Sequence, residues 1–555
     1  MNSFVQYLDQ FNVLSPSHSK IYDEYTGQGD VYQFSIDTKI EEFLLTGYSK
    51  APCSVIMTGN AGDGKTRLCR VVYESLTGNK LSEWPDSGIL DVPFDGGTVV
   101  IVKDLSELKD EVIFNVLLRL QEFIREGHAE NRYFLIAANE GKLTKFLSMH
   151  SELEELAAMV KQRFLYHGHN DSQLHLVNLQ DVTSSIYAER IMEEWNKEEY
   201  WSDCGSCGKA SNCIILLNHR RMARKQVRDR LAEQYRLLDC LGIHLTMREI
   251  LIHISYTLTG GLTCSDVQRA GYLDIEKHSK RVYFNNFYGV GMPGLESIEQ
   301  GAVRHFGELD PGQASISFID DYLLNGDISG ENVIAERHAR LFGEELDLLF
   351  GYYRKQIEVY RSQGNGGEEE IAELMPGFRR KYFFESEEEG ELRRKLIPYV
   401  HFYTFMESLE SRQKQTQVRR DLIRGLNYAF TKKLMDASET QLFAVNDNLL
   451  VHEAYSMGQV VLTVDESRDD LDRLPSRLFL TVDHETRLEM KLPVFEYLMR
   501  LADGGLNCTL KQEVDILLGT FRNDLISHSK LDEFLLVVFA LDPVKGVYVR
   551  REINM

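Results

Sequence analysis

The segment MTGNAGDGKTRLCR, residues 57–70, contains the P-loop pattern G-x-x-x-x-G-K-[ST] without a mismatch, from Gly59 to Thr66. In such a loop the backbone N–H groups cradle phosphates, Lys65 reaches the β- and γ-phosphates, and the Thr66 hydroxyl ligates Mg²⁺. The other interpretation is a chance glycine-rich turn. An apolar run, PCSVIMTG, leads into the loop and a helical pattern, KTRLCRVVYESL, follows it, which is the order that the pattern requires. We therefore expect ATP and Mg²⁺ as cofactors, with the nucleotide held by Gly59, Asn60, Ala61, Gly62, Asp63, Gly64, Lys65, Thr66 and Arg67.

Three further strand patterns follow the P-loop. The β-branched run in GGTVVIVKDLSEL predicts a strand over 98–103, RYFLIAANEGKL contains a third strand, and LHLVNLQDV contains a fourth. Amphipathic helical patterns separate these strands. This alternation predicts an α/β fold whose sheet is mostly parallel.

A chain of 555 residues is long for one hydrophobic core, so several domains are expected. The pattern turns helical after residue 183, the stretch 228–258 has the pattern of a helical lid, and strand patterns return near the end of the sequence. We expect an N-terminal lead-in, a P-loop core, a Cys-rich insert with a helical lid, a helical domain and a mixed α/β C-terminal domain, at residues 1–50, 51–200, 201–268, 269–440 and 441–555.

The composition is typical of a globular protein, with 43% hydrophobic and 26% charged residues. The sequence has no run of roughly 20 apolar residues, as a membrane span requires, and its first residues show neither a signal peptide nor a transit pattern. We therefore expect a cytoplasmic protein without a membrane partner. The net charge of -23 repels phosphates, so contact with DNA would need partner proteins or a local basic patch.

Acidic residues near the strand ends are candidates for the chemistry of hydrolysis. Asp104 ends a strand, where a carboxylate can hold Mg²⁺ through water, and its alternative role is to cap the next helix. The usual arrangement is Asp followed at once by Glu, the general base that activates water. Here Leu105, Ser106 and Glu107 follow Asp104. Glu107, slightly favoured, and Glu140 are the candidates for this base, and either can instead be a solvated carboxylate at a helix start.

One amide and two guanidinium groups complete the expected site. Asn139 ends its own strand, where its amide can orient the attacking water, although it is equally suited to a turn. Arg163 lies at the end of the helix before the fourth strand, and Arg248 opens a lid helix in LTMRE. Either arginine can stabilise charge on a transferred phosphoryl group, in cis or across the subunit interface of a homo-oligomer, and either can instead be a surface residue.

The order of these features is similar to that of the AAA+ class of ATPases, over roughly residues 50–265. Within that class, FNVLSPSHSK, GNAGDGKT and IAANEGKL resemble the F component of bacterial phosphorothioation-dependent restriction systems, or a related antiphage-defence ATPase. The displaced acid after Asp104 departs from the general AAA+ pattern. The resemblance implies an ATPase subunit that works beside separate DNA-recognition and nuclease proteins.

Three cysteines are crowded together in CGSCGKASNC, where Cys204, Cys207 and Cys213 have the spacing C-x-x-C-x-x-x-x-x-C. Two thiolates three residues apart can share one Zn²⁺, and a tetrahedral structural site needs four ligands. His219 is the nearest candidate for the fourth ligand, followed by Cys240. The alternative is three free thiols in a loop, and no thioredoxin-like context supports a redox role.

The stretch FRRKYFFE, residues 378–385, interleaves basic and aromatic side chains, a combination that can stack on bases and bind phosphates. The alternative is a helix whose aromatic residues pack inward while Arg379, Arg380 and Lys381 face water or acidic neighbours. The acidic run ESEEEGE that follows is typical of a solvated surface.

Together these patterns predict an ATP-hydrolysing subunit of a DNA-restriction or antiphage complex, which couples turnover to assembly or to DNA processing by partner proteins. The alternative is a nucleotide-dependent signalling or scaffold switch with little or no hydrolysis, and the missing adjacent glutamate favours it. We find no nuclease signature in the sequence, so any cleavage of DNA is expected to be carried out by a partner protein.

Overall fold

A computed structural model shows that the chain folds into two compact units. The larger unit contains residues 1–236, 244–396 and 468–473, and the smaller contains 237–243, 397–467 and 474–555. The change of unit after Leu396 falls inside the expected helical domain 269–440. The structure describes residues 1–13, 15, 32, 35–126, 131–292, 301–326, 338, 341, 362, 368–387, 391–436, 439–465, 468–505, 512–529 and 535–554. The stretch FNVLSPSHSK, residues 11–20, therefore lies mostly outside the described residues. None of the described helices is long and apolar enough to cross a membrane.

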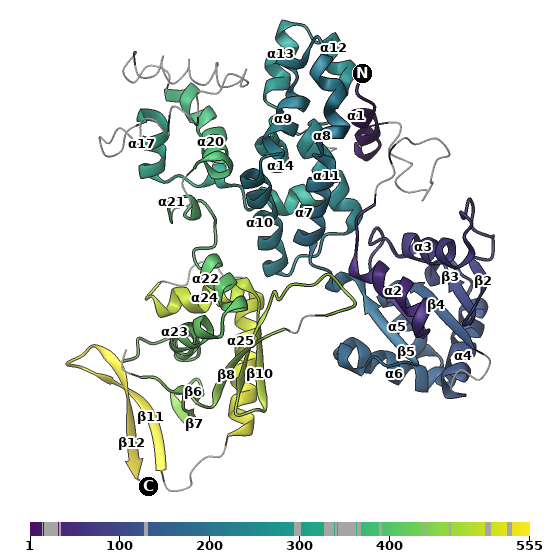
Figure 1. Cartoon of the computed structure of the whole chain (residues 1–555). Helices are drawn as coiled ribbons and strands as arrows, with labels where there is room; N and C mark the ends of the chain where they lie inside the picture. The colour runs from purple at the N-terminus through teal and green to yellow at the C-terminus, as the bar shows by residue number, and fades with distance from the viewer. Residues whose placement is uncertain are drawn as a thin grey trace. The chain divides into compact units, whose positions relative to one another are not determined.

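The larger unit contains a five-stranded sheet with the order β2-β3-β4-β1-β5 (Figure 1). Strand β1 (Ser54–Thr58) pairs in parallel with β4 (Arg132–Ala138) and β5 (Leu174–Asn178), and β4 pairs in parallel with β3 (Gly97–Val102). The edge strand β2 (Ile89–Phe94) is antiparallel to β3. The predicted α/β fold with a mostly parallel sheet is therefore confirmed.

Strand β2 was not predicted, although its sequence carries a signal. The run ILDVPF, residues 89–94, is followed by Asp95 and Gly96, and β3 begins at Gly97. The two strands therefore form a tight hairpin. A dipeptide of Asp and Gly between two strand patterns is a strong hairpin signal. Pro93 lowers the strand propensity of this run, but the outer position of β2 tolerates a residue without an N–H group.

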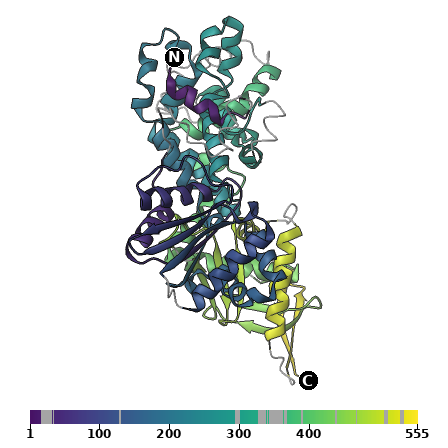
Figure 2. The same ribbon diagram turned by 90° about the vertical axis from the view of Figure 1, so that its right-hand side faces the viewer.

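Helices cover both faces of the sheet because its strands are apolar on both faces (Figures 1 and 2). Helices α4 (Asp110–Arg125), α5 (Glu140–Met149) and α6 (Glu154–Leu165) pack on one face against alternate strand residues such as Ile56 and Ile136. Helices α2 (Lys39–Lys50) and α3 (Lys65–Thr77) lie on the opposite side (Figure 1). Each fully buried aliphatic side chain contributes about 1.5–3 kcal/mol.

Helix α11 (Met247–Thr259) organises the helical part of this unit. It begins with a capping box formed by Thr246 and Glu249, and Gly260 ends it in the left-handed conformation with φ 61°. Its neighbours include helix α1 (Ser3–Leu8), because the Ser255 hydroxyl donates to the Leu8 carbonyl at 2.9 Å. The other described α-helices of the unit are α7 (Ser184–Trp195), α8 (Glu198–Trp201), α9 (Ile214–Met222), α10 (Lys225–Leu241, whose last turn belongs to the smaller unit), α12 (Cys264–Arg269), α13 (Tyr272–Ser279), α14 (Tyr283–Phe287), α16 (Gly301–Gly307), α17 (Ser317–Asn325), α20 (Glu368–Glu385) and α21 (Glu391–Arg394).

The stretch 378–385 forms the last two turns of α20, and its aromatic side chains are buried. Its three cations form ion pairs with acids inside the unit: Arg379 with Asp320 at 2.7 Å, Arg380 with Asp310 at 2.6 Å, and Lys381 with Glu385 at 2.8 Å. The alternative interpretation, a helix with inward aromatic residues and acid-paired cations, therefore describes this segment. The stretch is not a surface on which bases could stack.

The smaller unit has a mixed α/β architecture, as the sequence predicts for this part of the chain. Helices α23 (Arg412–Thr431) and α24 (Leu492–Ala502) approach so closely that a Cβ atom at Gly425 would lie 2.2 Å from the Leu498 carbonyl oxygen. The unit also contains α22 (Phe402–Glu410) and α25 (Gln512–His528), the antiparallel sheet β10-β9-β8 (Thr486–Met490, Leu478–Val482, Val460–Val464) and the sheet β12-β11-β7-β6 (Val547–Asn554, Leu535–Asp542, Leu450–Tyr455, Leu442–Val445).

A buried charge cluster holds α20 in the larger unit, and it yields a first prediction. Glu385 accepts from Arg221, Lys381 and the Tyr283 hydroxyl at 2.9, 2.8 and 2.9 Å. Burial alone raises the pKa of Glu385, but the two cations outweigh burial and lower it below its ordinary 4.5. We expect Glu385→Gln to lower the free energy of unfolding by about 3–5 kcal/mol, because two buried cations lose the carboxylate that they share.

Urea titrations of the wild type and the variant would measure this difference. The contribution of Glu385 is present above pH 4.5 and is lost as pH falls through the lowered value, so the two proteins should converge in acid. Glu198→Gln, at an exposed position of α8, is the control and should change stability by less than about 0.5 kcal/mol. Equal losses in the two variants would contradict this account.

Candidate functional site

The P-loop connects the carboxyl end of β1 to the first turn of α3. Gly62 and Gly64 have φ values of 98° and 86°, which only glycine adopts without strain. Gly64 is the N-cap of the 13-residue helix α3, so Lys65 and Thr66 open that helix. A helix N-terminus after a glycine-rich turn presents free N–H groups and positive potential, which suits an anion.

The Lys65 ammonium is folded back over the loop that precedes it. Its Nζ donates to the Gly59 carbonyl at 3.0 Å and to the Asn60 carbonyl at 2.7 Å, and the side chain is buried. Burial lowers the pKa of Lys65, while Asp63 and Asp104 act in the opposite direction. Asp104 therefore lies near enough to Lys65 for their charges to interact, as the predicted roles of these two residues require.

The loop is tied to the residues that open α11. His244 Nε2 lies 2.9 Å from Asp63 Oδ1, and the Arg248 N–H donates to the Gly62 carbonyl at 3.2 Å. A Cβ atom at Gly62 would lie 3.1 Å from the Arg248 Cβ, so the two backbones pack directly. The structure thus brings Arg248 beside the P-loop, about 190 residues away in sequence from Gly59.

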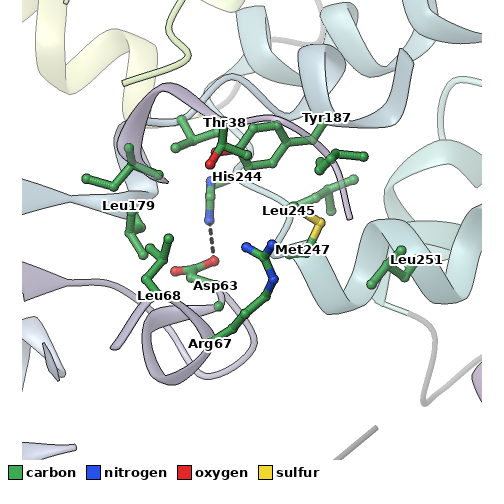
Figure 3. A pocket seen from close by; sticks show the side chains of 14 residues that line it. Thr38, Asp63, Arg67, Leu68, Leu179, Tyr187, His244, Leu245, Met247 and Leu251 are labelled. Atoms are coloured by element: carbon green, nitrogen blue, oxygen red, sulfur yellow. Dashed lines mark hydrogen bonds and ion pairs between the residues drawn. The ribbon is translucent and has the colours of Figure 1, made fainter. Parts of the chain in front are cut away.

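A cavity of about 680 Å³, its open mouth included, lies beside this junction (Figure 3). Its lining is mostly apolar, as in small-molecule sites, with Ile36, Ile40, Leu68, Leu179, Val182, Tyr187, Leu245, Met247 and Leu251. The polar side chains in the lining are Thr38, Asp63, Arg67 and His244. Arg67 also forms an ion pair with Glu41 at 2.9 Å. Of the predicted site residues, Asp63, Gly64 and Arg67 line this cavity, and sequence reasoning missed the rest because they come from four separate segments.

The cavity walls are supported by residues 468–473, which we call the strap. The Asp472 carboxylate accepts from the Lys39 N–H and from Arg190, both at 2.9 Å, and its carbonyl accepts from the Thr183 N–H at 2.9 Å. Lys39 and Thr183 directly follow the lining residues Thr38 and Val182. Asp472 therefore fixes two walls of the cavity from a segment that no local pattern connects with the P-loop.

The acidic candidates lie in different surroundings. The Asp104 carboxylate caps the following turn by accepting from the Ser106 N–H at 2.8 Å, which is its alternative role, and its charge also acts on Lys65. Glu107 is 62% exposed and lies 3.4 Å from Lys103. Glu140 accepts from Asn178 at 3.1 Å, and Asn178 pairs with the last residue of β1 in the sheet. Glu140 is thus held at the carboxyl ends of the strands, where the P-loop begins, whereas Glu107 is mostly exposed to solvent.

Asn139 and Arg163 have structural partners. The Asn139 side chain caps α5 by accepting from the Lys142 N–H at 3.2 Å. Arg163 is buried and donates to the Leu174 carbonyl at 3.0 Å and to Asp171 at 2.8 Å. Leu174 begins β5, so this guanidinium lies at the amino ends of the parallel strands, whereas the P-loop follows the carboxyl end of β1. Its guanidinium anchors α6 to β5, and the expectation that Arg163 reaches a phosphoryl group stays a prediction.

The Cys-rich segment lies in two short 3-10 turns before α9. Cys213 caps α9, and Asn2 donates to the Cys204 thiol at 3.2 Å. Burial raises the pKa of Cys213 to about 11, with smaller contributions from Cys204 and Cys264, so Cys264 is a nearby thiol that sequence spacing did not reveal. In the part of the chain that the structure describes, no three His, Cys, Asp or Glu side chains are close enough together to hold a metal ion.

The expected fourth zinc ligand has other partners. The His219 ring stacks on Trp201 with a centroid distance of 4.2 Å, and its Nδ1 lies 3.1 Å from the Asn196 side-chain oxygen. Burial lowers the pKa of His219 to about 4. Cys240 is part of the smaller unit. The zinc site therefore remains a prediction.

Comparisons with protein-family models, with curated protein sequences and with solved structures find no match for this chain. The candidate site is therefore defined by its own geometry: a glycine-rich loop, a lysine, and an adjoining apolar cavity.

Metal analysis of purified protein tests the zinc prediction. If the prediction holds, protein purified without chelator contains about one zinc per chain, and Cys207→Ser loses it and melts at a lower temperature, since thiolate ligands stabilise such loops. Cys53→Ser, at a cysteine in front of β1, is the control and should retain the metal. Zinc at background level in the wild type would remove the prediction.

Proposed function

We propose that this protein is an ATPase with a P-loop core of the AAA+ type and a helical lid that begins at α11. The observation that carries the proposal is the position of Lys65, at the first turn of α3 with its ammonium over the loop carbonyls. A bound triphosphate offers this cation stronger acceptors than two neutral carbonyl oxygens, because charge-assisted hydrogen bonds are about twice as strong as neutral ones. Lys65 is therefore placed to exchange the loop carbonyls for phosphate oxygens.

The chemistry of the surrounding residues supports ATP with Mg²⁺. The N–H groups at the start of α3 would bind the phosphates, Thr66 and Asp104 would hold Mg²⁺, and the adjoining apolar cavity would take the base. Mg²⁺ supplies neutralisation of the phosphate charge in such sites. Arg248 opens α11 directly beside the loop, where its guanidinium would stabilise charge on the transferred phosphoryl group.

For the water-activating base we propose Glu140 in preference to Glu107. A general base must lie within hydrogen-bond reach of the water that attacks the γ-phosphate. Glu140 is held by Asn178 at the sheet edge that carries the P-loop, whereas Glu107 is largely exposed beside Lys103.

We further propose that ATP turnover serves a DNA-restriction or antiphage complex. This step rests on the resemblance of GNAGDGKT and IAANEGKL to the phosphorothioation-dependent family. The net charge of -23 and the burial of residues 378–385 support contact with DNA through partner proteins, namely DNA-recognition and nuclease subunits. Arg248 would act in cis, so hydrolysis by this proposal does not depend on a homo-oligomer.

One observation favours the alternative of a nucleotide-dependent switch with little or no hydrolysis. Asp104 is not followed by a glutamate, and the nearest one, Glu107, forms its contact with Lys103. In a switch of this kind, ATP would set the position of α11 without being consumed. Steady-state turnover, measured with and without DNA and partner proteins, separates the two functions.

Lys65→Ala tests the proposed binding of the nucleotide by the P-loop. Removing the ammonium deletes the charge-assisted contact to the phosphates and leaves the backbone of the loop in place, so ATP affinity should fall strongly and turnover should be abolished while the protein stays folded. Lys80→Ala, at an exposed position just beyond α3, is the matched control and should behave as wild type. Calorimetric titration with ATP provides the measurement, and an unchanged affinity in Lys65→Ala would rule out the P-loop assignment.

Glu140→Gln and Glu107→Gln together identify the base. Glutamine keeps the shape of the side chain but cannot accept the proton, so Glu140→Gln should lower turnover by roughly two to four orders of magnitude while ATP binding survives. Glu107→Gln should retain wild-type turnover, and phosphate release assays would measure both. If both variants hydrolyse ATP at the wild-type rate, or if the wild type shows no turnover with DNA and partners present, the proposed ATPase function fails. The alternative of a nucleotide-dependent switch then remains.

A further inference from the structure

The His244 ring has one nitrogen that the protein leaves without a partner. Its Nε2 bonds to Asp63 Oδ1 at 2.9 Å, whereas its Nδ1 is buried and makes no hydrogen bond with the residues that the structure describes. The side chain lines the cavity beside the P-loop, and Figure 3 shows the ring above Asp63 in that space. A buried polar atom without a partner is rare and costs stability, so its presence at a cavity suggests a ligand.

Three other polar side chains of the cavity have partners within the protein. Asp63 Oδ2 accepts from the Asn60 N–H at 2.5 Å, the Thr38 oxygen accepts from the Glu41 N–H at 3.3 Å, and Arg67 forms an ion pair with Glu41. The rest of the wall is aliphatic, apart from Met247 and the ring and hydroxyl of Tyr187. His244 Nδ1 is therefore the buried ring nitrogen of the described lining that can distinguish one base from another.

The neighbour at Nε2 decides what Nδ1 can do. A carboxylate only accepts hydrogen bonds, so the Nε2 that faces Asp63 carries a hydrogen. In the neutral ring with its hydrogen on Nε2, Nδ1 keeps a lone pair and acts as an acceptor. An acceptor at this position pairs with an amino group and opposes a carbonyl oxygen.

Resting on the proposed function, we propose that His244 selects adenine over guanine, with Nδ1 accepting a hydrogen bond from the 6-amino group of the base. Adenine presents this amino group as a donor at the position where guanine presents a carbonyl oxygen. Guanine would place its carbonyl oxygen opposite the buried Nδ1, so that two acceptors meet and neither is satisfied. The role of Asp63 is to orient the ring and fix its tautomer, so the loop that binds phosphate also sets the choice of base.

Nucleotide analogues test this proposal on the wild-type protein. Calorimetric titration in the presence of Mg²⁺ would compare ADP with GDP and with purine riboside diphosphate, which is ADP without the 6-amino group. We expect ADP to bind about tenfold more tightly than the purine riboside compound, because one hydrogen bond to a buried acceptor is lost. GDP should bind about a hundredfold more weakly than ADP, because a site built to pair one group rejects the analogue that lacks it.

Two variants then assign the preference to His244. His244→Gln supplies an N–H for Asp63 but has no acceptor at the Nδ1 position, so the ratio of the ADP affinity to the purine riboside diphosphate affinity should fall to about one. Met247→Leu, on the same cavity wall, should change both affinities by one common factor and keep the ratio, since the two side chains have similar volume.

Equal binding of ADP and purine riboside diphosphate by the wild type, or tighter binding of GDP, would overturn the role of His244 while nucleotide binding by the P-loop stands. An unchanged preference in folded His244→Gln would overturn it too. If the wild type binds none of the three nucleotides, the proposed ATPase function fails and this inference fails with it. The analogue series needs no variant, so it decides the question even if His244→Gln does not fold.

Discussion

The hydrogen bond between His244 and Asp63 is the contact on which the candidate site depends. One end belongs to the loop at the carboxyl edge of the sheet, and the other precedes α11, the helix around which α1, α7, α9 and α14 pack. The Arg248 N–H adds a backbone bond to Gly62 in the same place. These two hydrogen bonds connect the glycine-rich loop directly to the helical part of its unit.

The strap gives the cavity a second constraint. Asp472 is buried, and its acceptors bind Arg190 and the backbone N–H groups of Lys39 and Thr183, so the segments before α2 and after β5 are fixed relative to each other. The chain on both sides of the strap belongs to the smaller unit. The cavity walls are thus shaped by a segment whose chain continues directly into the other unit.

Buried ionic groups in this protein serve two different purposes. The Glu385 cluster and the Arg163–Asp171 pair have their hydrogen bonds satisfied by side chains and carbonyls that hold helices in place. Lys65 is bonded to loop carbonyls that a phosphate can replace, and the charges of Asp63 and Asp104 oppose the lowering of its pKa by burial. The first kind of group is expected to be inert, whereas the second can change partners, which is a requirement of a binding site.

The sequence by itself determined the parts of this protein that depend on neighbours along the chain. The parallel strands and the helices that follow them could be predicted, because turn residues and hydrophobic periodicity act within about one turn or strand. Only the tertiary structure decided which residues meet across long distances. His244 reaches Asp63, Asp472 fixes two cavity walls, and Glu140 lies at the carboxyl ends of the strands, where the P-loop begins. Arg163 shows the reason most clearly, since a guanidinium at a helix end can serve either edge of a sheet, and only the packing of α6 on β5 fixes which one.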